Sequence, residues 1–414
     1  MYGLRRFGIK LGLATIKRIL AGLGNPQADY ACIHVAGTNG KGSVASSLAT
    51  ILHHAGYKVG LYTSPHLVRF NERICINNRP ISDEAVVASY RAVKEVHSGG
   101  REPTFFEFST AMALFEFGRQ RVDWAVIETG MGGRLDATNA VCPAVAIITN
   151  VSLEHREYLG NTLIQIAHEK AGIIKRRTPV VTGIRQSGPL AIVDTIAAAR
   201  SAPLYRLGRD FRVRRHPSGG FSYFGIENVW RRLTTALSGD HQIENAALVL
   251  ATCELLNRNA VGLAFDNIKA GLATNQWPGR LEIVATEPHI ILDGAHNLMA
   301  ARKLARFLSK NLADRPITLV VGILADKPYA AMLHSLLPPC RRVILTCPQI
   351  DRGLPPEKLY AVAQDLKADS RIIPVVAEAV RYAVQTAKPQ DVICIAGSLY
   401  VVGEAKTALV NMGY

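Results

Sequence analysis

Short apolar runs alternate with longer stretches of helical periodicity through most of the chain. In the first half these runs are rich in β-branched residues and cover residues 31–35, 58–62, 124–129, 145–150 and 179–182. Runs without polar alternation are typical of strands with both faces buried, as in parallel sheets covered by helices. The pattern predicts an α/β fold whose first domain contains a doubly wound parallel sheet.

A second series of apolar runs follows the segment 276–279. It covers residues 290–292, 317–321, 343–346, 372–376 and 392–396. A chain of 414 residues also exceeds the usual size of one hydrophobic core. We therefore expect two domains, a P-loop-type domain over residues 1–283 and a smaller Rossmann-like α/β domain over residues 284–414.

The segment 211–224 departs from this alternation. It reads as two short strands on either side of a His-Pro-Ser-Gly-Gly turn. This pattern predicts a small antiparallel β annex to the first domain.

The formal net charge of +15 narrows the choice of partners. Basic residues are dispersed, with local clusters at 175–177, 212–215 and 231–232, and no basic helix is interleaved with aromatic residues. We therefore expect no nucleic-acid partner. Small anionic substrates suit this charge, because a basic surface attracts them over long distances.

The N-terminal sequence does not predict a signal peptide or a membrane span. Arg5, Arg6 and Lys10 are followed by apolar residues that Lys17 and Arg18 interrupt. Seven cysteines occur without a CxxC pair, which favours buried, reduced thiols. We expect a cytoplasmic protein without a membrane partner, and we expect it to be a monomer.

The strongest local signal is a glycine-rich loop between a predicted strand and a predicted helix. Its sequence is Gly37-Thr38-Asn39-Gly40-Lys41-Gly42-Ser43. Backbone N–H groups in such a loop surround phosphate oxygens, and the lysine reaches the terminal phosphates. The spacing departs from GxxxxGK(S/T), because Gly42 follows the lysine. The loop predicts a nucleotide-binding site.

This heptapeptide resembles the phosphate loop of the dihydrofolate synthase/folylpolyglutamate synthase family, the folate branch of the Mur ligases. Further motifs resemble that family in order and nearly in spacing, and they lie at 62–67, 70–74, 104–107, 128–139, 154–155, 169–173, 241–245, 278–282, 293–297 and 397–400. The resemblance spans nearly the whole chain.

The resemblance also implies roles for individual residues. The implied ATP contacts are Thr38, Asn39, Gly40, Lys41, Gly42, Ser43, Asn245, Arg280 and Asp293. The implied Mg²⁺ ligands are Ser64, Glu128, His155 and Lys170, the last as a carbamate. The implied pterin contacts are Thr104, Phe105, Phe106, Glu107, Leu135, Asp136 and Ala137. The implied catalytic residues are Lys41, Lys170 and His296.

The position of Glu128 favours its implied role, because it ends an apolar strand before a glycine-rich turn, and ligands bind at the carboxyl edge of a parallel sheet. Other residues also have a purely structural interpretation. Phe105 and Phe106 can stack on a flat heterocycle or belong to the core. Asp136 can orient a pterin or cap a turn. Lys170 can be a surface lysine of a helix.

The chemistry of His155 and Arg280 alone would not select them. Mg²⁺ prefers oxygen ligands, so the alternative for His155 is a solvated loop histidine. The guanidinium of Arg280 can pair with phosphates or stack on adenine, and its alternative is a surface charge.

The resemblance implies an ATP-dependent acid–amino-acid ligase with ATP and Mg²⁺ as cofactors. ATP would phosphorylate a substrate carboxylate, and the amine of L-glutamate would attack the acyl phosphate. The acceptors would be dihydropteroate, forming dihydrofolate, and reduced folates, forming folylpolyglutamates.

Three alternatives stay open. They are folylpolyglutamate synthase activity alone, a cell-wall Mur-type amino-acid ligase, and a noncatalytic nucleotide- or nucleic-acid-binding protein. Cell-wall ligases carry a nucleotide-sugar domain ahead of the loop, whereas 36 residues precede Gly37, so we do not expect that activity.

Overall fold

A computed structural model describes residues 12–97, 101–217, 219–366 and 369–414. Arg5, Arg6 and Lys10, on which the N-terminal expectation rests in part, lie outside the described residues. The chain divides into two compact units. Unit 1 comprises Met1–His66, Phe70–Ala236 and Gln242–Gln276, and unit 2 comprises Leu67–Arg69, Leu237–His241 and Trp277–Tyr414.

Unit 1 is built on one large sheet. Its described residues form eight strands in the order β4-β3-β2-β5-β1-β6-β7-β8, of which β3 and β4 are antiparallel to their neighbours and the others are parallel. The strands are β1 (Ala31–Ala36), β2 (Val59–Tyr62), β3 (Ile74–Ile76), β4 (Arg79–Pro80), β5 (Trp124–Glu128), β6 (Val145–Ile148), β7 (Val180–Thr182) and β8 (Leu204–Arg206). The five strands expected from the apolar runs of the first half are all present.

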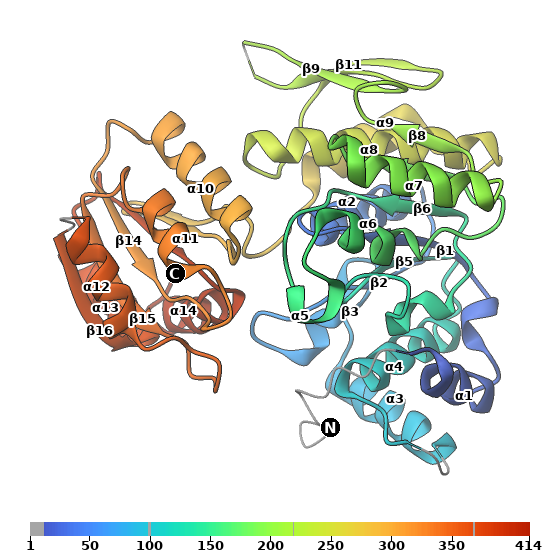
Figure 1. The fold of residues 1–414 in the computed structure, drawn as a ribbon, viewed down its shortest axis with the longest axis horizontal. Coiled ribbons are helices and arrows are strands. Elements are labelled where there is room, and N and C mark those ends of the chain that lie inside the picture. The colour runs from blue at the N-terminus through green and yellow to red at the C-terminus, as the bar shows by residue number, and fades with distance from the viewer. Residues whose placement is uncertain (1–11, 98–100, 218, 367–368) are drawn as a thin grey trace. The chain divides into compact units, whose positions relative to one another are not determined.

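Helices cover both faces of this sheet (Figure 1). On one face, Ala125 and Ile127 of β5 pack in a core cluster with α1 (Ala14–Gly22) and α4 (Phe105–Arg119). Their neighbour Val126 points to the opposite face, and α2 (Lys41–His54) packs against β1, β2 and β5. The predicted doubly wound sheet is therefore confirmed.

The remaining helices of unit 1 pack against these elements. They include α3 (Asp83–Val96) against α4, α6 (Leu163–Ala171) against α7 (Ser187–Ala199), and α9 (Phe265–Thr274) against α2. The short α5 (Arg156–Leu159) precedes α6, and α8 (Asp240–Arg258) precedes α9.

The annex is a small antiparallel sheet, with three strands among the described residues instead of the two expected. Their order is β11-β10-β9, with bounds β9 (Arg212–Arg215), β10 (Phe221–Phe224) and β11 (Val229–Leu233). The sequence of β11 did not predict a strand, because Arg231 and Arg232 are exposed and break the alternation. Buried Glu254 of α8 anchors the annex, since its carboxylate accepts from the Tyr223 hydroxyl at 2.7 Å and from the Asn228 N–H at 2.6 Å.

Unit 2 is a second three-layer α/β structure. Its described residues form a six-stranded sheet in the order β12-β13-β17-β14-β15-β16, parallel except for β12. The strands are β12 (Glu282–Thr286), β13 (His289–Leu292), β14 (Ile317–Val321), β15 (Arg342–Cys347), β16 (Asp369–Val375) and β17 (Val392–Ala396). The predicted Rossmann-like architecture is confirmed.

Two helical layers cover the sheet of unit 2. Helices α10 (Leu298–Asn311), α11 (Tyr329–Leu336) and α12 (Pro356–Asp365) pack in one core cluster. Helices α13 (Val376–Thr386) and α14 (Leu399–Asn411) pack in the other. The expected domain boundary at 283/284 falls within β12, whereas the division by contacts comes between Gln276 and Trp277.

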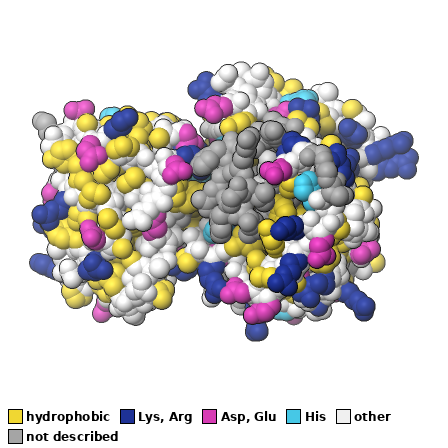
Figure 2. All heavy atoms as spheres, turned by 90° about the horizontal axis from the view of Figure 1, so that it is seen from below, with side chains coloured by type: hydrophobic (Ala, Val, Ile, Leu, Met, Phe, Trp, Pro, Cys, Tyr) yellow, Lys and Arg dark blue, Asp and Glu magenta, His cyan; other side chains and the backbone are white. Residues whose placement is uncertain are grey.

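Two expectations from composition can be compared with the structure. All seven cysteines lie in the described part of the chain and are unpaired, but Cys142 is exposed, contrary to the expectation of buried thiols. Across the described residues, none of the helices combines the length and the hydrophobicity that crossing a membrane requires. On the face drawn in Figure 2, Lys and Arg side chains stand singly or in small groups among acidic and apolar ones.

Candidate active site

The segment after β6 holds the glycine-rich loop between β1 and α2 in shape. The N–H of Thr38 donates to the Asn150 carbonyl, and the N–H of Asn39 donates to Asn150 Oδ1, both at 3.0 Å. The Thr149 hydroxyl donates to the Asn39 carbonyl at 2.7 Å. A β-carbon on Gly37 would lie 1.8 Å from Thr149 Oγ1, so only glycine permits this approach. The loop is therefore preformed at the carboxyl end of β1.

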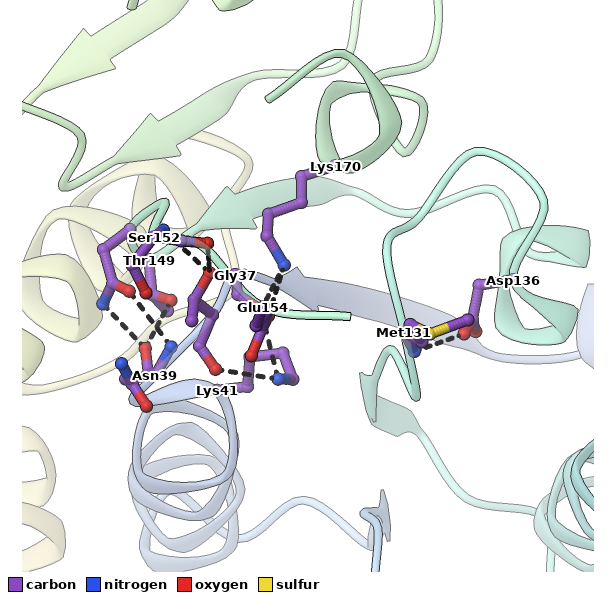
Figure 3. A network of polar contacts seen from close by, with 11 residues as sticks. Gly37, Asn39, Lys41, Met131, Asp136, Thr149, Ser152, Glu154 and Lys170 are labelled. Carbon is purple, nitrogen blue, oxygen red and sulfur yellow. Dashed lines mark hydrogen bonds and ion pairs between the residues drawn. The ribbon is translucent and has the colours of Figure 1, made fainter. Parts of the chain in front are cut away.

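The lysine of the loop begins helix α2. Lys41 Nζ donates to the carbonyls of Gly37 and Thr38, at 3.1 and 3.2 Å, so its ammonium lies over the loop (Figure 3). Gly42 and the buried Ser43 follow in the first turn of this 14-residue helix. The first N–H groups of a helix have no partner within the helix and carry positive potential. This arrangement suits phosphate.

The structure also brings Asn245 to this loop. A β-carbon on Gly40 would lie 2.6 Å from Asn245 Oδ1, so the two residues pack closely. Asn245 Nδ2 donates to Gln242 Oε1 at 2.8 Å, and Gln242 Nε2 donates to Ser43 Oγ at 3.3 Å. The predicted ATP contacts of unit 1 therefore form one cluster.

The expected metal ligands Ser64 and Glu128 lie together. Glu128, the last residue of β5, is paired in register with Val35 of β1 and is buried. Its Oε2 accepts from the Ser64 N–H at 3.2 Å. The set has one carboxylate and one hydroxyl beside the phosphate-loop strand, which are the oxygen donors that Mg²⁺ prefers. His155 directly precedes α5, in a left-handed conformation with φ 46° and without a capping hydrogen bond from its side chain.

Within the described ranges, no three His, Cys, Asp or Glu side chains lie together so as to hold a metal. The expected ligand set contains only two residues of those types, Glu128 and His155, so this finding does not bear on it.

Lys170 is buried, and the interpretation of this residue as a surface lysine is wrong. Its side chain is 1% exposed, and Nζ donates to the Gly37 carbonyl at 2.8 Å and to Glu154 Oε1 at 3.1 Å (Figure 3). Burial lowers the pKa of Lys170, while the charge of Glu154 opposes that change. The lysine thus lies against the phosphate loop, beside the residue that precedes His155.

The segment 104–107 begins helix α4 with a capping box. The Thr104 hydroxyl accepts from the Glu107 N–H at 3.2 Å, and Glu107 Oε2 accepts from the Thr104 N–H at 2.8 Å. Arg101 pairs with Glu107 at 2.6 Å. Thr104 and Glu107 therefore have a structural role. Phe105 and Phe106 are half-buried and pack at the edge of the core.

Asp136 caps a short 3₁₀ turn, which is the structural alternative expected for it. Its Oδ1 accepts from the N–H and the hydroxyl of Thr138, at 3.0 and 2.5 Å. Its Oδ2 accepts from the Met131 N–H at 2.8 Å (Figure 3). Burial raises the pKa of Asp136, and these hydrogen bonds oppose the change. Ala137 is buried, and Leu135 is half-buried.

The two segments expected to hold the pterin lie side by side. A β-carbon on Gly130 would be 2.4 Å from the ring of Phe106, so the ring packs on this glycine. Gly130 is two residues beyond Glu128 and directly precedes Met131, whose N–H binds Asp136. The expected metal ligands Ser64 and Glu128 and the expected pterin contacts Phe106 and Asp136 therefore lie near the carboxyl end of β5.

In unit 2, the expected residues gather at the carboxyl end of β13. Asp293 accepts from the N–H groups of Leu281 and Ala295, both at 2.9 Å. Burial raises the pKa of Asp293, and the charge of Arg280 opposes the change. A β-carbon on Gly294 would lie 2.3 Å from Arg280 Nη1, and the Gly294 carbonyl lies 2.9 Å from His296 Nδ1.

Four residues of this site were not singled out as site residues from the sequence. Thr149 and Asn150 shape the phosphate loop, Gln242 joins it to Asn245, and Glu154 pairs with Lys170. Thr149 and Asn150 end the run 145–150 and directly follow β6, and polar residues at the carboxyl end of a parallel strand are a signal for a site.

Comparison with known proteins agrees with this arrangement. Residues 35–253 match the Mur ligase middle domain, and residues 279–399 match the Mur ligase glutamate ligase domain. The dihydrofolate synthase/folylpolyglutamate synthase of Bacillus subtilis is 35% identical over 99% of this chain and 97% of its own.

Solved structures agree as well. E. coli FolC in complex with DHPP and ADP has a TM-score of 0.91 at 30% identity, covering 100% of this chain and 96% of its own. A bifunctional folylpolyglutamate synthase/dihydrofolate synthase from Yersinia pestis, complexed with AMPPNP and Mn ion, has a TM-score of 0.89 at 32% identity, covering 99% of this chain and 96% of its own.

The fold and the phosphate loop are those of the Mur ligases, ATP-dependent enzymes that form amide bonds. Within that class, the chain belongs to the dihydrofolate synthase/folylpolyglutamate synthase family. The predicted enzyme class is thereby confirmed, as is the use of ATP with a divalent metal by this family.

Proposed function

We propose that this chain joins L-glutamate to dihydropteroate, forming dihydrofolate, and to reduced folates, forming folylpolyglutamates. The observation that carries the proposal is the set of contacts at the carboxyl end of β5. Glu128 contacts Ser64 there, Gly130 lies under the ring of Phe106, and Met131 binds Asp136. A phosphoryl-transfer subsite and a subsite for a flat heterocycle therefore share one strand end in unit 1.

The phosphate loop would bind the nucleotide. Backbone N–H groups at 38–43 and the ammonium of Lys41 are arranged to hold phosphate oxygens, and Asn245 lies beside them. In unit 2, Arg280 and Asp293 offer a cation for phosphates or adenine and a carboxylate for ribose hydroxyls.

Ser64, Glu128, His155 and carbamylated Lys170 would hold Mg²⁺. The bound ion would supply positive charge for the phosphoryl group in transfer. Support comes from the chemistry of the donors and from the position of Glu128 beside Val35, next to the phosphate loop. A carbamate on Lys170 would present two anionic oxygens beside the Gly37 carbonyl, where the amine now lies.

The reaction would proceed in two steps. A carboxylate oxygen of the acceptor attacks the γ-phosphorus, the bond to the ADP oxygen breaks, and an acyl phosphate forms. The amine of glutamate then attacks the acyl carbon, loses a proton, and phosphate leaves. Lys41 would exchange its bonds to Gly37 and Thr38 for phosphate oxygens, which stabilises the charge in transfer. His296, oriented by the Gly294 carbonyl, is the proposed catalytic residue of unit 2.

The pterin would bind against Phe106 and Asp136. The half-buried Phe105 and Phe106 offer ring faces for stacking, and the carboxylate of Asp136 can accept from the pterin's N–H groups. The other proposed contacts are Thr104, Glu107, Leu135 and Ala137.

The proposed partners are small molecules alone, namely ATP, L-glutamate, dihydropteroate and reduced folates. We propose that the chain acts as a monomer in the cytoplasm and binds no nucleic acid. The dispersed basic side chains support the absence of a nucleic-acid partner, because a nucleic-acid site is typically a continuous basic patch.

Phosphate release from ATP tests the proposal directly. With Mg²⁺ and glutamate, release should occur with dihydropteroate and with tetrahydrofolate supplied in turn, and labelled glutamate should enter both. Incorporation into tetrahydrofolate alone would leave the folylpolyglutamate synthase alternative. Failure with both acceptors would refute the proposed function.

A further inference from the structure

His34 is a buried histidine that the proposed reaction does not use. It lies on β1, two residues before the end of the strand, and its side chain is fully buried. Its Nε2 lies 2.8 Å from Thr138 Oγ1, in the loop expected to hold the pterin. Its Nδ1 is buried and has no hydrogen-bond partner among the described residues.

The direction of these hydrogen bonds follows from the proton on Thr138. Its hydroxyl lies 2.5 Å from Asp136 Oδ1, and a carboxylate can only accept. The hydroxyl therefore donates its single proton to Asp136, so Thr138 Oγ1 must accept a hydrogen bond from His34. The ring is then the neutral Nε2–H tautomer with a bare Nδ1, which agrees with burial lowering the pKa of His34 to about 3.

This hydrogen-bonded chain joins two parts of the fold that are far apart in sequence. His34 belongs to the strand that leads into the phosphate loop, and Thr138 and Asp136 belong to the loop after β5. The hydroxyl of Thr138 and its own N–H both donate to Asp136 Oδ1. With Oδ2 accepting from Met131, the orientation of the carboxylate is fixed.

We propose that His34 is a positioning residue for the pterin-bearing substrate, which it orients through Thr138 and the carboxylate of Asp136. The inference rests on the proposed function, because it takes Asp136 as a pterin contact. His34 does not touch the substrate. Its role is to hold the Thr138 hydroxyl with its proton toward Asp136.

Two substitutions at position 34 separate the hydrogen bond from the packing. His34→Phe keeps a ring but removes the donor, and His34→Gln places an amide N–H near the original Nε2. His34→Phe should raise the KM for dihydropteroate roughly tenfold, the effect of about one hydrogen bond between neutral groups, and should leave the KM for ATP within about twofold. His34→Gln should restore most of the loss.

Two further variants serve as controls. Thr138→Val also removes the bond to Asp136 and should raise the KM for dihydropteroate at least as much as His34→Phe. The double variant should be no worse than Thr138→Val alone, because His34 acts only through Thr138. Ile33→Val trims a fully buried neighbour on the opposite face of β1 and should move neither KM more than about twofold. An equal rise in both KM values for His34→Phe, or no change in either, would overturn the proposal.

Nitrogen-15 NMR of histidine-labelled enzyme provides a test that needs no turnover. The His34 signal, assigned by its loss in His34→Gln, should report the Nε2–H tautomer and should not titrate between pH 5.5 and 8. An Nδ1–H tautomer, or titration in that range, would refute the chain of hydrogen bonds. If the wild type fails to ligate glutamate while this signal is as expected, the proposed function fails and the hydrogen-bonded chain stands.

Discussion

Replacing buried Lys170 with methionine should destabilise the protein by about 3–5 kcal/mol. The lysine side chain is 1% exposed, and its partner Glu154 is 8% exposed at a distance of 3.1 Å. Methionine is close to lysine in volume, so the cavity contribution is small. The cost comes from removing the adjacent cation of the buried Glu154 carboxylate, which typically amounts to about 3–5 kcal/mol. The charges of Lys41 and His155 also act on this carboxylate and place the loss at the lower end of that range. The Gly37 carbonyl also loses a donor.

A second substitution tests this reasoning. Lys170→Met/Glu154→Met removes both charges and should recover most of the lost stability, because replacing a whole buried pair is often nearly neutral. Lys269→Met, at an exposed position of α9, is the matched control and should stay within about 0.5 kcal/mol of wild type. Urea unfolding measures all three. A loss below about 1 kcal/mol for Lys170→Met would mean that the buried pair is not formed in solution.

Three further outcomes follow from the structure. Carbon-13 NMR with labelled bicarbonate should show a carbamate on Lys170 only when Mg²⁺ and nucleotide are present, because the carbamate and Glu154 are both anions and repel each other without a cation. No carbamate signal with or without Mg²⁺ and nucleotide would exclude the modification. Lys41→Ala and Glu128→Ala should each abolish turnover with melting temperatures close to wild type, and near-normal activity in either would refute the nucleotide and metal assignment. His34 has its pKa lowered from 6.5 to about 3, so its stabilisation is complete above pH 6.5 and is lost as the pH falls, by about 2 kcal/mol at pH 5; urea unfolding of His34→Gln should lack this dependence.

The sequence predicted the strands that are buried on both faces, together with β9, β10 and the edge strand β16, but it missed β3, β4, β8, β11 and β12. The central strands β1, β5 and β6 are continuous apolar runs because helices cover both of their sides. In contrast, β8 lies at the edge of its sheet, and β12 alternates half-buried with exposed residues. Such strands form because of their hydrogen-bonded neighbours, which the periodicity of apolar residues in the sequence does not reveal.

The candidate site divides in a similar way. The phosphate loop is local in sequence, and its glycines and lysine predict it. The residues that shape it are remote: Lys170 reaches Gly37 across 133 positions, and Thr149 reaches Asn39 across 110. A pattern in one segment carries no record of such a partner, so these contacts came only from the fold.

The burial of Lys170 was nevertheless readable in the helix that carries it. Ile166, Ala167 and Ala171 form the buried face of α6, and Lys170 occupies the place four residues after Ile166 on that face. An ammonium on an apolar stripe must either leave the core or find an anion there, because a lone buried charge is too costly. The apolar stripe continues past the lysine, so the ammonium is expected to stay in the core and pair with an anion there. The same argument applies to Glu254, which lies within the buried stretch 245–256 of α8 and holds the annex through its carboxylate. A charge that interrupts a buried apolar stripe is therefore itself a signal, because it requires a partner contributed by another part of the chain.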